Sequence, residues 1–145
     1  MNDNINERVM SFHYVVPGND FTLAGEASGN LKKVLKQLGF LPEIIRRTTI
    51  SMYEGEINMV IHAGGGEADV VITPNKIDIL LHDNGPGIAD VNLAMQEGYS
   101  TAPDKIRALG FGAGMGLPNM KKYTDSLEIE TAVGKGTTVH MTVNV

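Results

Sequence analysis

The chain of 145 residues contains no cysteine and no tryptophan, and only 6% of its residues are aromatic. Without cysteine the protein can form no disulfide, no thiolate metal site and no cysteine nucleophile. This composition agrees with a reducing compartment, and we expect a cytoplasmic protein.

Basic residues are also scarce, since 12 Lys and Arg stand against 17 Asp and Glu and give a net charge of −5. A nucleic-acid partner is disfavoured, because binding to a phosphate backbone needs clustered Lys and Arg. No apolar run approaches the roughly 20 residues that cross a bilayer, and residues 1–7 lack the basic start and apolar centre of a signal peptide. We therefore expect no membrane association, and a basic protein surface or a metal-bound nucleotide as the partner.

The length and a hydrophobic content of 42% predict one globular domain over residues 1–145. Period-2 alternation predicts strands, and apolar residues three and four apart predict helices. The expected strands are 8–16, 67–73, 76–82, 127–131 and 139–145, and the expected helices are 21–38, 42–63 and 117–123. This order predicts an α/β (α+β) two-layer sandwich, in which helices cover one face of a mixed, mostly antiparallel sheet.

Three short patches carry the chemistry, and the first is Glu54 to Asn58 on the second predicted helix. Glu54 and Asn58 are four residues apart and so project from the same helix face. For a lone pair of this kind, a solvated polar stripe is the more common explanation. The functional interpretation is that Asn58 offers a neutral oxygen to Mg²⁺, while Glu54 acts as the general base for an attacking hydroxyl or water.

The second patch is Asp83-Asn84-Gly85-Pro86-Gly87-Ile88, at the end of a predicted strand. An acidic turn is one interpretation, because Asn-Gly and Pro-Gly are turn dipeptides. In the other, the carboxylate of Asp83 accepts a hydrogen bond from the exocyclic amine of adenine. Gly85 and Gly87 then let the backbone approach the ring.

The third patch places glycine at Gly110, Gly112, Gly114 and Gly116, immediately before a predicted helix. Backbone N–H groups that lead into a helix N-terminus can bind phosphates. A flexible linker is the alternative, although apolar residues interrupt the glycines. The patch is not a Walker loop, because no Gly-Lys-Ser/Thr sequence occurs.

Taken in this order, the patches resemble the N, G1 and G2 boxes of the Bergerat ATP-binding fold (GHKL, histidine-kinase-like), over roughly residues 40 to 145. The family includes gyrase, MutL, sensor histidine kinases and anti-sigma-factor kinases. The resemblance implies that ATP and Mg²⁺ bind, that residues 90–111 form a lid over the nucleotide, and that Thr137 lies near the adenine. It also places Ile88, Met115 and Leu117 among the residues that contact the nucleotide.

Within this family, the chain is similar to the stand-alone bacterial anti-sigma factors and switch serine/threonine kinases, in residues 97–101 and 116–122. This similarity implies an ATP- and Mg²⁺-dependent kinase with Glu54 as its base. It also implies a small regulatory partner, either an antagonist of the STAS type or a sigma factor, and a possible homodimer. The alternative is a non-catalytic anti-sigma module whose affinity for its partner is set by nucleotide.

Overall fold

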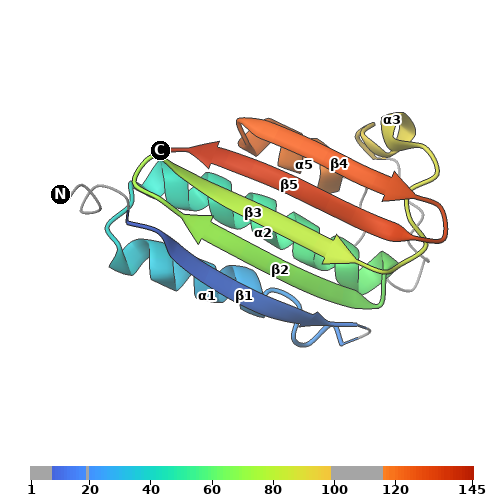
Figure 1. Ribbon diagram of the computed structural model, residues 1–145, viewed down its shortest axis with the longest axis horizontal. Coiled ribbons are helices and arrows are strands. Elements are labelled where there is room, and N and C mark those ends of the chain that lie inside the picture. The colour runs from blue at the N-terminus through green and yellow to red at the C-terminus, as the bar shows by residue number, and fades with distance from the viewer. Residues whose placement is uncertain (1–7, 19, 99–115) are drawn as a thin grey trace.

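A five-stranded sheet with its helices on one face forms the protein in the computed structural model, which describes residues 8–18, 20–98 and 116–145 (Figure 1). The strands lie in the order β1-β2-β3-β5-β4. Their bounds are Met10–Pro17 (β1), Gly65–Ile72 (β2), Lys76–Asp83 (β3), Ser126–Ala132 (β4) and Gly136–Asn144 (β5). We expected a mixed, mostly antiparallel sheet; every pairing in the described part of the chain is antiparallel.

The helices are α1 (Glu26–Gln37), α2 (Pro42–His62), the short α3 (Val91–Ala94) and α5 (Gly116–Tyr123). α1, α2 and α5 pack side by side behind the sheet (Figure 1). α1 begins five residues later than the sequence pattern suggests. Asp20 accepts hydrogen bonds from the backbone N–H and the hydroxyl of Thr22 at 3.1 and 2.5 Å, which stabilises a turn in place of a first helical turn.

The hydrophobic core lies between the sheet and the helix layer. Leu31 and Leu35 of α1 and Met52 of α2 are fully buried against Ile79 of β3 and Met141 of β5. The alternation of apolar residues that predicted the strands therefore arises because one face of the sheet is buried. None of the helices in the described segments is both long and apolar enough to cross a bilayer.

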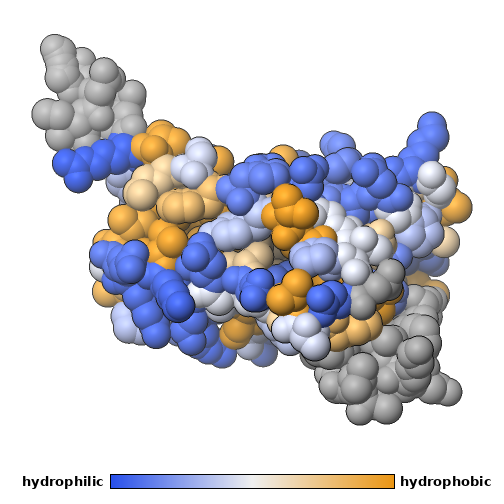
Figure 2. Space-filling model, turned by 90° about the horizontal axis from the view of Figure 1, so that it is seen from below, coloured by the Kyte–Doolittle hydropathy of each residue, from blue (hydrophilic) through white to orange (hydrophobic). Residues whose placement is uncertain are grey.

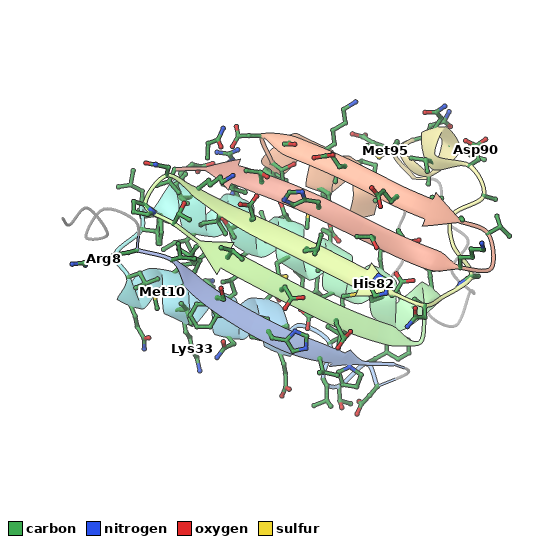
Figure 3. All side chains as sticks on the ribbon, in the orientation of Figure 1. Arg8, Met10, Lys33, His82, Asp90 and Met95 are labelled. Atoms are coloured by element: carbon green, nitrogen blue, oxygen red, sulfur yellow. The ribbon has the colours of Figure 1, made fainter. Side chains whose placement is uncertain are left out.

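The opposite face of the sheet is open and mostly polar (Figure 3). Its side chains pair across the strands: His13 contacts Asp69 at 2.7 Å, His82 contacts Thr138 at 2.9 Å, and His140 contacts Asp78 at 3.0 Å. The hydrogen bond that His13 donates to the carboxylate of Asp69 raises the pKa of this exposed histidine. His62, the last residue of α2, is exposed, but the surrounding protein partly desolvates its ring, and this desolvation lowers its pKa.

Candidate functional site

The first patch lies where α2 faces the N-terminus of α5. Glu54 and Asn58 are both partly exposed and one helical turn apart. The backbone of Gly116, the first residue of α5, is so close to Asn58 that a side chain there would meet the Asn58 amide nitrogen at 2.8 Å. The predicted base and the predicted metal ligand therefore lie together beside the helix that follows the glycine-rich patch.

Glu54 is held by Asn119, a residue that the sequence analysis missed. The Nδ2 group of Asn119 on α5 donates a hydrogen bond to Oε2 of Glu54 on α2. Further along α5, Nε of Arg47 donates to the backbone oxygen of Tyr123 at 3.1 Å. α5 is thus fastened to α2 near its middle and at its C-terminal end, and the first of these contacts directs the candidate base.

Glu56 lies in the same patch but has a different role. Its carboxylate, in a residue only 2% exposed, accepts backbone hydrogen bonds from Gly25, Ala27 and Ser28 at 3.0, 3.0 and 3.1 Å. These donors are at the N-terminus of α1, where helical N–H groups have no partner within the helix. Glu56 therefore caps α1, and Glu54 is the glutamate of this patch that remains available for chemistry.

Asp83 ends β3 with its carboxylate oriented by the backbone. Its Oδ1 atom accepts hydrogen bonds from the N–H groups of Gly85 at 2.9 Å and of Thr137 at 3.3 Å. Within the described residues, no hydrogen bond involves Oδ2. One oxygen is therefore fixed by the protein, and the other is left for a ligand.

Gly85 and Gly87 are both required by protein contacts. A side chain on Gly85 would lie 2.6 Å from Cβ of Ala63, and one on Gly87 would lie 2.3 Å from the backbone oxygen of Ala132. Gly87 also has a φ of +79°, which favours glycine. Packing alone explains these two glycines, whatever ligand binds beside them.

The loop after Asp83 is joined to the β4–β5 hairpin by two threonines. The hydroxyls of Thr131 and the buried Thr137 are 2.9 Å apart, and the N–H of Ile88 donates to the Thr131 hydroxyl at 2.8 Å. Thr137 and Asp83 are also direct partners in the pairing of β5 with β3. The structure therefore brings Asp83, Ile88 and Thr137 together, and it adds Thr131, which the sequence pattern did not single out.

The remaining predicted residues have different outcomes. Gly110, Gly112, Gly114 and Met115, and part of the expected lid at 90–111, lie outside the described residues. Leu117 is 7% exposed and packs in the hydrophobic core, so its role in this structure is to anchor α5. The described residues include no cluster of three or more His, Asp or Glu that could hold a metal ion, so Asn58 stands as a single candidate ligand.

Comparison with known proteins places this chain in a family. Residues 50–145 match the family described as "Histidine kinase-, DNA gyrase B-, and HSP90-like ATPase". The serine/threonine-protein kinase RsbT of Bacillus subtilis is 30% identical over 112 residues, which cover 74% of this chain and 78% of RsbT. An anti-sigma F factor of Caldanaerobacter subterraneus is 39% identical over 101 residues, 66% of each protein. The mycobacterial sensor histidine kinase MprB, at 17% identity, has the same fold, with a TM-score of 0.52 over 93% of this chain and 97% of that structure.

Proposed function

Because the chain belongs to the family of histidine kinase-, DNA gyrase B- and HSP90-like ATPases, we propose that it is an ATP- and Mg²⁺-dependent protein kinase. It transfers the γ-phosphate of ATP to a serine or threonine hydroxyl of a small regulatory protein. The observation that carries this proposal is the pair formed by Glu54 and Asn119. A partly exposed carboxylate, directed by an amide and placed one turn from Asn58, is what a general base requires.

Asp83 is proposed to select adenine. Its Oδ2 atom accepts a hydrogen bond from the exocyclic amine, while Oδ1 stays bound to the N–H groups of Gly85 and Thr137. Guanine carries a carbonyl oxygen at the corresponding position, which would face the carboxylate as a second acceptor. Thr137 and Ile88 lie on the same side of the site and contact the base or its water.

Asn58 is the residue that would hold Mg²⁺. Its amide oxygen is the hard, neutral donor that this ion accepts, and no hydrogen bond to a described residue occupies it. A bound ion neutralises negative charge on the phosphates. Glycine at position 116 keeps the space beside the Asn58 amide open, because a Cβ there would fill it. The backbone N–H groups of Gly110, Gly112 and Gly114 stay the predicted phosphate cradle.

Glu54 is proposed to orient the hydroxyl of the partner protein and to accept its proton during in-line transfer. Oε2 is held by Asn119, which leaves Oε1 for the incoming hydroxyl. Positioning of the two reacting groups, with charge stabilisation, is the main catalytic contribution in phosphoryl transfer. The protein supplies that positioning by fastening α5 to α2.

A second candidate is a non-catalytic, nucleotide-gated anti-sigma module. The similarity to proteins named anti-sigma F factor favours it. In that case nucleotide orders the site and so sets the affinity for a sigma factor or an antagonist, and no base is needed.

Transfer of radiolabelled phosphate from ATP to candidate regulatory proteins, with Glu54→Gln beside the wild type, separates the two candidates. Glutamine keeps the size of the side chain but cannot take a proton at neutral pH. A kinase loses transfer by a general-base contribution of roughly 10²–10⁴-fold while it keeps nucleotide affinity. Equal transfer by the two proteins removes Glu54 from the mechanism. A wild type that transfers nothing, yet binds a candidate more tightly in ATP than in ADP, replaces the kinase with the binding module.

A further inference from the structure

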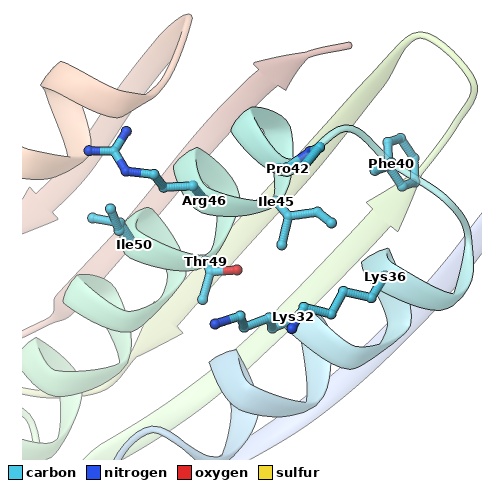
Figure 4. A pocket seen from close by; sticks show the side chains of 8 residues that line it. All are labelled: Lys32, Lys36, Phe40, Pro42, Ile45, Arg46, Thr49 and Ile50. Carbon is cyan, nitrogen blue, oxygen red and sulfur yellow. The ribbon is translucent and has the colours of Figure 1, made fainter.

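A groove on the helix layer, away from the candidate nucleotide site, has the chemistry of a docking surface. It has a volume of about 620 Å³ and runs between α1 and α2 (Figure 4). Its apolar lining comes from Phe40, Pro42, Ile45 and Ile50. The residues of the patches at 54–58 and 83–88 are not part of this lining.

The rim of the groove is basic. Lys32 and Lys36 of α1 and Arg46 of α2 line it, and none of the described lining residues is acidic. Lys32 and Lys36 are exposed, and neither is in a salt bridge within the described residues. Arg46 is already engaged, since it contacts Glu43 at 3.3 Å and lies 5.1 Å from the centre of the Tyr123 ring. Among the described residues that line the groove, the two lysines are therefore the cations without a salt bridge.

The helix layer formed by α1, α2 and α5 has a net charge opposite in sign to that of the whole chain. α1, α2 and α5 carry seven Lys and Arg against four Glu, whereas the chain has a net charge of −5. Of the four glutamates, Glu56 is buried beneath α1. The helix layer thus concentrates positive potential on an acidic protein, which selects an acidic partner.

Apolar surface continues from the groove to one end of the molecule. Leu38 and Leu41, on either side of Phe40 in the connection between α1 and α2, are 42% and 70% exposed. Figure 2 shows hydrophobic side chains gathered toward the left end of the molecule, and Figure 1, which has the same horizontal axis, places the α1–α2 connection at that end. In the groove itself, Thr49 has a buried hydroxyl oxygen with no hydrogen-bond partner among the described residues.

We propose that this groove docks an acidic amphipathic helix of the regulatory protein partner. Lys32 and Lys36 are four residues apart, so their ammonium groups lie one turn apart along the groove and match carboxylates at the same spacing on the docked helix. The apolar face of that helix covers Phe40 and Ile45, as in other helix-in-groove interfaces. A shallow open groove favours such a segment over a small molecule, because small ligands are usually enclosed over most of their surface.

The inference rests on the proposed function for the existence of a protein partner, but the groove can be tested without it. The probe is a synthetic helical peptide of about 18 residues, five turns, with leucine on one face and glutamate on the other. We expect it to bind the full chain, with NMR shift changes centred on the groove, and a version with lysine in place of glutamate to bind much more weakly. The double variant Lys32→Glu, Lys36→Glu should lose at least about tenfold in affinity.

Lys33→Glu is the matched control. Lys33 is also exposed on α1 but does not line the groove, because the next position is rotated by about 100° around the helix. The Lys33→Glu variant changes the charge of the same helix and should alter the affinity for the peptide less than twofold. Equal losses in Lys33→Glu and in the double variant, or equal binding of the glutamate and lysine peptides, would overturn the proposal.

Two further measurements test which kind of partner the groove binds. Vesicles of phosphatidylglycerol that bind the wild type but not the double variant, with no peptide binding, would make the basic face a membrane contact and overturn the proposal. In the transfer assay, the double variant should raise the KM for an acceptor protein and leave the KM for ATP unchanged. If no acceptor is phosphorylated, the proposed kinase activity is wrong, while peptide binding still tests whether the groove is a docking site.

Discussion

The amide of Asn119 donates a hydrogen bond to the carboxylate of Glu54, and so joins the helix that follows the glycine-rich patch to the helix that carries the candidate base. The two residues are 65 positions apart in the sequence. Leu117 and Met120, on the buried face of α5, fix the position of Asn119 by packing in the core. The direction of the Glu54 side chain is therefore set by the packing of α5.

Asn119→Leu removes this donor with little change in size, and we expect phosphate transfer to fall about tenfold or more. A hydrogen bond to a charged group contributes about 1.5–3 kcal/mol, and here its loss acts on the geometry of the base. Asn119→Asp should transfer less than Asn119→Leu, because it places a second carboxylate opposite Glu54. Steady-state transfer rates are measured beside ATP affinity by calorimetry. A loss of ATP affinity or melting temperature that matches the loss of rate would make Asn119 a purely structural residue.

The sequence distinguishes Glu54 from Glu56 only in part. Two positions on a helix are about 200° apart, so the two side chains must lie on opposite faces. The pattern around residue 54 does not say which face meets α1, because the cap of α1 depends on how two helices pack. Asp83 was predictable from its place at the end of an alternating strand, whereas Asn119 and Thr131 gain their roles from contacts between distant segments.

Glu56→Gln should destabilise the fold by about 2–4 kcal/mol. The amide replaces one accepting oxygen with a donor, so at least one buried N–H at the start of α1 loses its charged partner. Urea unfolding measures the change. Glu43→Gln is the matched control on the same helix, since Glu43 is exposed and its pairing with Arg46 is a surface contact. It should cost less than about 0.5 kcal/mol, and a similar small cost for Glu56→Gln would contradict the cap.

In the folded protein, the pKa of His13 should lie above 6.5 and the pKa of His62 below 6.5. The pKa of His13 is raised by its hydrogen bond to Asp69, and the pKa of His62 is lowered because the surrounding protein partly desolvates its ring. Because the unfolded chain binds a proton at His62 more readily than the folded protein, the contribution of His62 to stability is lost as the pH falls below 6.5. The contribution of His13 to stability is present below pH 6.5. It is lost as the pH rises through the higher pKa that His13 has in the folded protein.

NMR titration of the imidazole protons measures both pKa values directly. Asp69→Asn should lower the pKa of His13 and leave that of His62 unchanged, because Asp69 contributes to the shift of His13 and not to that of His62. A His62 pKa at or above 6.5 would show that the surrounding protein does not desolvate the ring.

Asp83→Asn should weaken ATP binding strongly and reduce the preference for adenine over guanine. The N–H groups of Gly85 and Thr137 require an acceptor at the Oδ1 position, so the amide oxygen takes that place and the NH₂ group faces the ligand. A donor then meets the exocyclic amine of adenine, whereas the carbonyl of guanine becomes an acceptable partner. A site that is built to hydrogen-bond its ligand discriminates strongly against a ligand with the wrong donor or acceptor.

Calorimetry with ATP and GTP measures both effects, and Asp78→Asn is the control, because Asp78 is on the same strand and faces the open side of the sheet. We expect a loss of at least about tenfold for ATP in Asp83→Asn, from the exchange of a charge-assisted acceptor for a donor, and none in Asp78→Asn. The ratio of ATP to GTP affinity carries the argument, since a general loosening of the site lowers both affinities together. An unchanged ratio, with a folded protein, would make Asp83 a turn residue that only supports the loop at 83–88.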